Sequence, residues 1–143
     1  DVGGVTFTAL PVVHWSRRSG FDTNKTLWAG FRMASADHSM FFGGDSGYGP
    51  VFKEIGEQYG PFDTALLGIG AYEPRAMMKA SHANPEEAVQ MALDLRACRV
   101  IGAQCFSLSS RLLSHLSAFA RQQRRQASQG PTPGSWPSAK RGL

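Results

Sequence analysis

Hydrophobic and polar positions in the N-terminal part of the chain follow the two periods of regular secondary structure. Runs rich in β-branched and aromatic residues predict strands over residues 5–13, 27–34, 40–43, 64–69 and 99–103. The short polar stretch 35–39 joins the second and third of these runs as a hairpin turn. The polar, turn-rich stretch 16–25 is expected to be a loop.

Helical periodicity is present in two further segments. Residues 50–59 begin with a proline, which suits the first turn of a helix, and space their apolar side chains at helical intervals until Gly60 and Pro61 end the helix. The second segment starts at Asn84, a good N-cap, followed by Pro85 and two glutamates that face the positive end of the helix dipole.

Strands and helices alternate through this part of the chain, which predicts a layered α/β domain over residues 1–103. Residues 104–143 have a different composition. Residues 108–119 could form one amphipathic helix, whereas residues 121–143 are rich in Gln, Ser, Pro, Gly and Arg. Such a composition buries too little apolar surface to offset the conformational entropy lost on folding, so we expect a divergent and largely disordered basic tail.

The net charge of +4 is unevenly distributed. Residues 1–94 hold 11 acidic and 7 basic residues, a balance of −4, whereas residues 95–143 hold 8 basic residues and no acidic one. The basic tail could attract nucleic acid or an anionic membrane. Because Phe119 and Trp136 are the only aromatic residues interleaved with its basic residues, we favour a solvated tail and predict no specific nucleic-acid partner. No apolar run reaches the roughly 20 residues of a membrane helix.

Candidate chemistry begins with a carboxylate at a strand end. Asp45 follows an apolar run inside a glycine-rich turn, and His14 stands 31 residues upstream at the end of another predicted strand. A histidine and a carboxylate are ligands that zinc accepts. Taken alone, His14 is more simply a strand-end histidine and Asp45 a turn residue. The two thiols, Cys98 and Cys105, are not spaced as a metal-ligand pair and suit a reduced compartment.

Longer blocks of sequence give these residues their context. Residues 41–50 (Phe-Phe-Gly-Gly-Asp-Ser-Gly-Tyr-Gly-Pro), 68–75 (Gly-Ile-Gly-Ala-Tyr-Glu-Pro-Arg) and 79–89 (Lys-Ala-Ser-His-Ala-Asn-Pro-Glu-Glu-Ala-Val) keep a specific order and spacing behind His14-Trp15-Ser16-Arg17-Arg18. Together they resemble the metallo-β-lactamase superfamily, and within it the N-acyl-phosphatidylethanolamine phospholipase D family. The resemblance runs from about Thr8 to about Gly102.

The resemblance implies a fold and a set of roles. The fold would be the second half of an αβ/βα sandwich, without the half that carries the family's His-x-His-x-Asp-His motif. It also implies two zinc ions, with His14 and Asp45 as metal ligands and Asp45 as the bridging carboxylate. His82 would act in catalysis and bind the substrate phosphate, and Arg17 would bind substrate. The family's last ligand histidine is replaced here, with Gln104 as the nearest match.

Other residues of these blocks are assigned minor roles. Glu73 and Arg75 are expected to form an ion pair that shapes the pocket. His38 and His115 are expected to be surface residues, and Cys105 is a weaker alternative to Gln104 at the lost ligand position.

The resemblance also implies an activity, which is zinc-dependent hydrolysis of N-acyl-phosphatidylethanolamine to N-acylethanolamine and phosphatidic acid. The substrate would be a phospholipid at a membrane surface, and the protein intracellular and peripherally membrane-associated. We interpret the chain as a fragment that has little activity alone. The alternative is a non-catalytic truncated or splice isoform that lacks metal ligands.

Overall fold

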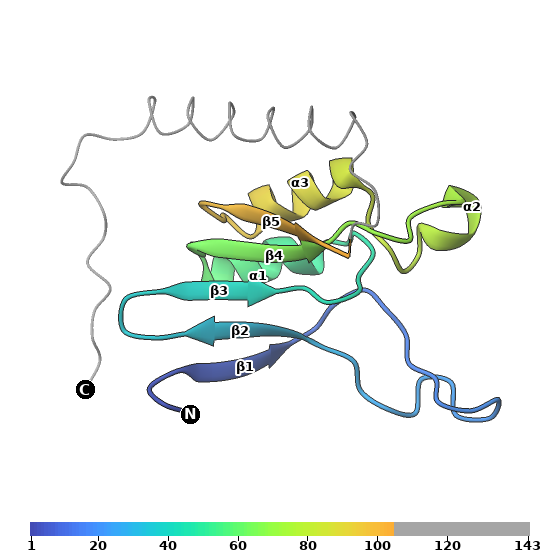
Figure 1. Cartoon of the computed structure of the whole chain (residues 1–143), viewed down its shortest axis with the longest axis horizontal. Helices are drawn as coiled ribbons and strands as arrows, with labels where there is room; N and C mark the ends of the chain where they lie inside the picture. The colour runs from blue at the N-terminus through green and yellow to red at the C-terminus, as the bar shows by residue number, and fades with distance from the viewer. Residues whose placement is uncertain (105–143) are drawn as a thin grey trace.

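The computed structural model describes residues 1–104. The helix predicted at 108–119, the tail expected to be disordered, Cys105 and His115 lie outside the described residues. The described elements, in chain order, are β1 (Thr6–Leu10), β2 (Gly30–Ala34), β3 (Ser39–Phe42), α1 (Val51–Tyr59), β4 (Thr64–Gly68), α2 (Arg75–Met78), α3 (Pro85–Asp94) and β5 (Val100–Ala103) (Figure 1).

The strands form one mixed sheet in the order β1-β2-β3-β4-β5. β1 and β2 pair antiparallel, as do β2 and β3 through the predicted hairpin, while β3, β4 and β5 pair in parallel. Parallel neighbours need crossover connections. α1 makes the first crossover, and the segment containing α2 and α3 makes the second. The expected α/β fold is therefore confirmed.

One face of the sheet is packed against α1 and α3, which Figure 1 shows on the same side. The side chains of Phe41, Ala65 and Leu67 point to this face and are fully buried. The ring of Phe41 meets the ring of Phe52 on α1 edge to face, with 6.1 Å between the centroids. Met91 on α3 completes the same core. Burial of this face is the main source of stability for the domain.

The other face of the sheet carries an apolar row that crosses four strands. The register aligns Phe31 with Phe42, Phe42 with Leu66, and Leu66 with Ile101. Aligned residues point to the same side of a sheet, so these side chains lie together, opposite the helices. Phe31 is 40% exposed and Ile101 is 53% exposed. Large exposed apolar patches are uncommon on monomeric soluble proteins. This face thus has the composition of an interface.

Two strand boundaries differ clearly from the sequence-based prediction, other boundaries shift by a single residue, and one helix was not predicted. The first strand ends at Leu10, because Pro11 has no backbone N–H to continue the ladder. The second strand begins at Gly30 instead of residue 27. The short helix α2 was not predicted, since Arg75–Met78 is too brief to show a periodic pattern. No helix among residues 1–104 is long and apolar enough to cross a membrane.

We expect substitutions on the sheet face opposite the helices, called the open face, to reduce self-association without unfolding the domain. Phe31→Thr combined with Ile101→Thr removes apolar surface and places β-branched side chains, which suit strands, at both positions. Static light scattering should show a smaller average mass for this variant at equal protein concentration. Leu67→Ala is the contrasting change, because its cavity in the covered face should cost about 2–5 kcal/mol of unfolding free energy. Unchanged self-association of the double variant would contradict the interpretation of this face as an interface.

A pH-dependent contribution to stability is expected from Asp63. Its Oδ2 accepts the Ser39 backbone N–H at 2.7 Å and the Ser39 hydroxyl at 3.1 Å, which joins the start of β4 to the start of β3. These bonds, the backbone N–H foremost, lower the pKa of Asp63 below its ordinary value of 3.8. A lowered folded-state pKa stabilises the fold above the unfolded-state pKa, and this stability is lost as pH falls through the folded-state pKa.

The measurement is thermal unfolding of wild type and Asp63→Asn between pH 7 and pH 3. Wild type should have the higher Tm at pH 7, and the difference should shrink as the carboxylate becomes protonated below about pH 4. A Tm difference that stays constant over this range would show that the charge of Asp63 is not responsible.

Candidate functional site

The direction of the strands brings the candidate residues to one edge of the sheet. β1, β3, β4 and β5 all run the same way, so their carboxyl ends share an edge, on the right in Figure 1. His14 follows β1, Asp45 follows β3 and Gln104 follows β5 directly. His82 lies in the connection between α2 and α3. Ligands of α/β proteins commonly bind at the carboxyl ends of strands.

The buried hydroxyl of Ser46 ties two of these strand ends together. Its Oγ accepts the Val13 backbone N–H at 2.9 Å, and the Gly47 N–H donates to the Val13 carbonyl at 2.8 Å. The Ser46 carbonyl in turn accepts the Ala83 N–H at 2.8 Å. Ser46 is only 3% exposed, so these bonds are shielded from competing water. The candidate residues His14, Asp45 and His82 are the sequence neighbours of this serine and its partners.

The imidazole of His14 is held in a defined tautomer. Its Nδ1 lies 2.7 Å from the Trp15 carbonyl oxygen, which can only accept, so Nδ1 carries the proton. Its Nε2 is buried and has no hydrogen-bond partner among the described residues. A protonated Nδ1 bound to a carbonyl with a free Nε2 lone pair is the arrangement found in metal-ligating histidines.

His82 contacts His14 directly. The two rings meet edge to face, with 5.3 Å between their centroids. Both side chains are half-buried. The structure therefore brings together two of the predicted site residues: His14, expected to bind metal, and His82, expected to bind substrate.

Asp45 lies on the same edge with an exposed side chain. The preceding Gly44 has a φ of +58°, in the left-handed region that glycine adopts without strain. This turn directs the chain from β3 into the Ser46 contacts. The predicted glycine turn is therefore present, and it leaves the carboxylate open to solvent.

Arg17 lies in the long loop between β1 and β2. Its side chain is exposed, and Nε donates to the Ser19 carbonyl at 3.0 Å within the same loop. Asp22 organises this loop by accepting the backbone N–H groups of Ser19 and Arg18 at 2.6 and 3.0 Å. The Ser19 N–H is the main cause of a lowered pKa of Asp22.

Gln104 occupies the edge position at the end of β5, with a φ of +61°. Its side chain lies over the end of β4. A methyl group placed on Gly68 would be 2.8 Å from the Gln104 Oε1 and 2.8 Å from the Gly44 carbonyl oxygen. The position next to the Asp45 turn thus holds a neutral amide, which is a poor ligand for zinc compared with imidazole.

These residues offer donor atoms that a metal ion could use. His14 fits a ligand role through its free Nε2, and Asp45 through its accessible carboxylate. Zinc sites generally use three or four protein ligands. Within residues 1–104, no group of three or more His, Cys, Asp or Glu side chains is placed to hold a metal ion. The described residues alone therefore do not complete a site.

Sequence reasoning missed several residues that build this edge. Ser46 was visible as part of an Asp-Ser-Gly turn, but its burial depends on contacts with the distant Val13. The expected ion pair between Glu73 and Arg75 is wrong. The Arg75 guanidinium pairs with Glu87 at 2.8 Å, and the Glu73 carboxylate instead accepts the Arg75 backbone N–H at 3.1 Å. The start of α3 provides a carboxylate that the linear sequence could not place.

A further tie holds the loop after Asp45 to α3. The Tyr48 hydroxyl donates to the Asp94 Oδ2 at 2.8 Å, and this bond is the main cause of a raised pKa of Tyr48.

Sequence comparison identifies relatives of the whole described region. Residues 1–103 match the family model described as the beta-lactamase superfamily domain. The chain is 44% identical over 99 residues to N-acyl-phosphatidylethanolamine-hydrolyzing phospholipase D 1 of Caenorhabditis elegans, covering 68% of this chain and 28% of that protein. It is 42% identical over 97 residues to outer membrane protein RomA of Klebsiella pneumoniae, covering 68% of this chain and 71% of that protein.

Solved structures show the same fold. The metallo-β-lactamase fold protein YhfI of Bacillus subtilis superposes with a TM-score of 0.62 at 19% identity, covering 83% of this chain and 45% of YhfI. The metallo hydrolase Igni18 of Ignicoccus hospitalis superposes with a TM-score of 0.58 at 20% identity, covering 88% of this chain and 48% of Igni18. The chain thus spans about half of each structure and 28% of the nematode relative. By its match over residues 1–103, this chain belongs to the beta-lactamase superfamily, with the metallo-β-lactamase fold and similarity to N-acyl-phosphatidylethanolamine-hydrolysing phospholipases D.

Proposed function

We propose that this chain contributes part of the active site of a metal-dependent hydrolase that cleaves N-acyl-phosphatidylethanolamine to N-acylethanolamine and phosphatidic acid. The observation that carries the proposal is the contact between His14 and His82 at the strand-end edge, with the His14 Nε2 unpaired among the described residues. The sequence similarity to the nematode phospholipase D supports the choice of substrate.

In this proposal, His14 and Asp45 are the ligands that these residues offer to a divalent metal centre, zinc by preference. Bound metal would supply a hydroxide nucleophile near neutral pH, since coordination lowers the pKa of water from about 15.7 to about 7. The remaining ligands must come from beyond residues 1–104. The two ligands stand on different strand ends, and the Ser46 bonds hold those strand ends at a fixed spacing.

We assign to His82 the role of acting on the substrate phosphate. Its ring lies against His14, so a phosphodiester bound near the metal ligands would be within reach of the imidazole. A histidine there can donate a hydrogen bond to a phosphoryl oxygen or transfer a proton to the leaving alkoxide. Arg17, on the exposed loop, is proposed to attract the anionic headgroup before it reaches the edge. The protein would then work at a membrane surface, peripherally attached and intracellular.

A specific observation favours the second candidate function, a non-catalytic isoform. Gln104 stands where the resemblance requires a ligand histidine, and its side chain already lies over Gly68 beside the Gly44 carbonyl. A neutral amide at this position weakens the metal site even when other ligands are supplied. The two candidates are separated by one measurement, which is hydrolysis with and without the substitution Gln104→His.

We predict that a chimera will hydrolyse N-acyl-phosphatidylethanolamine when residues 1–104 replace the matched segment of the nematode relative. Gln104→His in this chimera should raise kcat/KM by about tenfold or more if residue 104 belongs to the ligand set. His14→Ala and Asp45→Asn should abolish activity, whereas His38→Ala, in the hairpin turn, is the matched control. The assay is chromatographic detection of N-acylethanolamine and phosphatidic acid.

A folded chimera that is inactive both with Gln104 and with Gln104→His would contradict the proposed activity. A chimera that is active only when it carries Gln104→His would assign the natural chain to the non-catalytic alternative.

Zinc retention gives an independent prediction. The 143-residue chain alone should lose added zinc on gel filtration, because residues 1–104 contribute fewer ligands than a stable site needs. The folded chimera should retain zinc, and His14→Ala should reduce the amount retained while His38→Ala leaves it unchanged. Metal content is measured by atomic emission. Stoichiometric zinc on the chain alone would show that our ligand assignment is incomplete.

A further inference from the structure

The guanidinium of Arg75 connects the site to two separate elements. Arg75 begins α2, and its Nη1 donates to the backbone carbonyl of His82 at 2.9 Å. Its Nη2 lies 2.8 and 2.9 Å from the two carboxylate oxygens of Glu87, in the first turn of α3. The side chains are 26% and 20% exposed, so this pair is partly shielded from water. Such shielding strengthens charge-assisted hydrogen bonds relative to those of a solvated surface pair.

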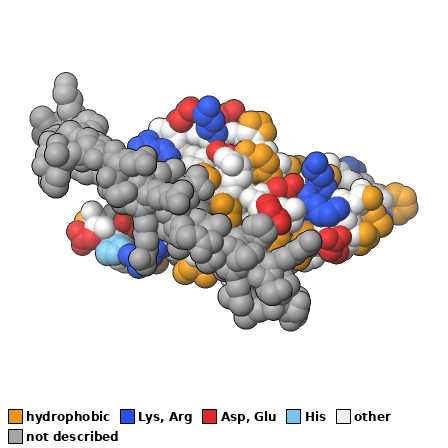
Figure 2. All heavy atoms as spheres, turned by 90° about the horizontal axis from the view of Figure 1, so that it is seen from above, with side chains coloured by type: hydrophobic (Ala, Val, Ile, Leu, Met, Phe, Trp, Pro, Cys, Tyr) orange, Lys and Arg blue, Asp and Glu red, His pale blue; other side chains and the backbone are white. Residues whose placement is uncertain are grey.

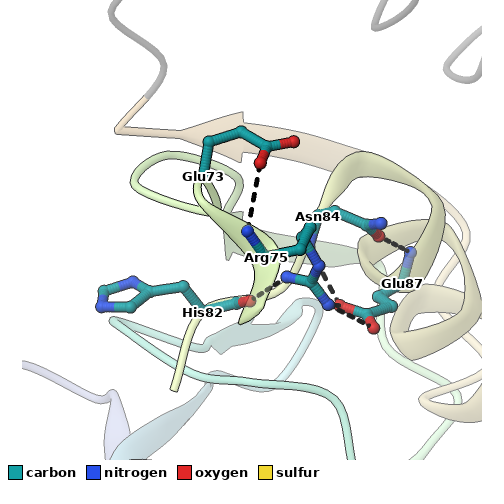
Figure 3. A network of polar contacts seen from close by, with 5 residues as sticks. All are labelled: Glu73, Arg75, His82, Asn84 and Glu87. Atoms are coloured by element: carbon teal, nitrogen blue, oxygen red, sulfur yellow. Dashed lines mark hydrogen bonds and ion pairs between the residues drawn. The ribbon is translucent and has the colours of Figure 1, made fainter. Parts of the chain in front are cut away.

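The carboxylate of Glu87 has a second partner. It accepts the Asn84 backbone N–H at 3.1 Å, while the Glu87 N–H donates to the Asn84 side chain at 2.8 Å. This reciprocal pair is a capping box, which fixes where α3 begins. Figure 3 shows Asn84, Glu87 and Arg75 as one connected network. Through Glu87, the start of α3 and the Arg75 guanidinium are held in one geometry.

This network holds the backbone of His82 from one side. The His82 N–H donates to the Met78 carbonyl at 2.8 Å, and the next residue, Ala83, is anchored to the Ser46 carbonyl. In Figure 3 the His82 carbonyl points toward Arg75, while the imidazole points away from it. With its backbone held at these points, the imidazole projects toward His14.

We propose that Arg75 is a positioning residue, which sets the place of the His82 imidazole by binding the His82 carbonyl and Glu87 at the same time. This inference rests on the proposed function, in which His82 acts on the substrate phosphate. Arg75 acts through His82 and does not itself contact the reacting atoms.

A purely structural ion pair between α2 and α3 is the competing explanation. Figure 2 shows basic and acidic side chains side by side on the surface of the molecule, where ion pairs can form without serving a site. The two explanations differ in whether residue 75 must carry a guanidinium group. An ion pair accepts lysine, whereas simultaneous bonds to a carbonyl and to both carboxylate oxygens require the planar fork of arginine.

The test uses the full 143-residue chain and two variants. Arg75→Lys keeps the charge but loses the fork. Glu87→Gln introduces an amide that can still complete the capping box, but removes the charged partner of Arg75. Glu57→Gln, on α1, is the control that removes one negative charge elsewhere. The readout is the nuclear Overhauser effect between the carbon-bound ring protons of His14 and His82, with Tm measured on the same samples.

We expect the His14–His82 Overhauser effect to weaken or vanish in both variants, with backbone chemical shifts of the sheet unchanged and Glu57→Gln like wild type. In the active chimera, Arg75→Lys should lower kcat/KM on the order of 10–100-fold, as misplacement of a catalytic group does, with zinc content unchanged.

An Overhauser effect of wild-type intensity in Arg75→Lys would overturn the proposal. Loss of the whole fold in both variants would also overturn it, since the network would then be a folding element only. The ring contact is measured on the chain alone, without an assay. An inactive chimera therefore counts against the proposed function, while a retained ring contact counts against the role of Arg75.

Discussion

The site depends on one constraint, which is the hydrogen bonding of Ser46 where the strand ends converge. Parallel strands bring their carboxyl ends to one edge, but the loops beyond them are free to diverge unless something joins them. The Ser46 hydroxyl and carbonyl join the segments of residues 13, 46 and 83. Each of these residues neighbours a proposed functional side chain, so one buried serine sets three positions. Because the serine is 3% exposed, leaving one of its partners unsatisfied would carry a desolvation cost of about 1–3 kcal/mol.

Around this serine, the groups that position the two histidines differ from the ring atoms proposed to bind metal or substrate. His14 gains its tautomer from the Trp15 carbonyl, and His82 gains its position from the Arg75 network. The hydrogen bonds that position the two histidines are made by backbone groups or by the Arg75 network. That network contacts the His82 carbonyl, and the His82 imidazole points away from it. The imidazole of His82 and the Nε2 of His14 remain available to bind. Preorganisation of this kind raises the effective concentration of reacting groups.

The apolar face of the sheet opposite the helices follows from the layered architecture of the described residues. A sheet with helices on one side leaves an apolar layer that needs a second layer to be buried. The row from Phe31 to Ile101 is that layer, and the chain covers 45% of the YhfI structure that it superposes on. Gln104 lies at the carboxyl end of β5, where its side chain covers Gly68 beside the Gly44 carbonyl.

The sequence by itself determined the local features of this protein. The hairpin turn after residue 34, the helix start at Pro50 and the Asn84 N-cap depend on neighbouring residues, so their signals were readable directly. The family resemblance and the α/β class were confirmed as well. The ligand and substrate roles of His14, Asp45, His82 and Arg17 remain predictions.

Only the tertiary structure decided which distant groups meet. The contact of His14 with His82 joins the loop after β1 to the second crossover, and the burial of Ser46 depends on Val13; no local pattern encodes either contact. The choice of Glu87 over Glu73 by Arg75 has the same origin. Glu73 is nearer in sequence, but its carboxylate binds the Arg75 backbone, while α3 presents Glu87 directly to the guanidinium. Long-range packing fixes these partners because it sets the positions of whole helices and strand ends, which short-range propensities leave free.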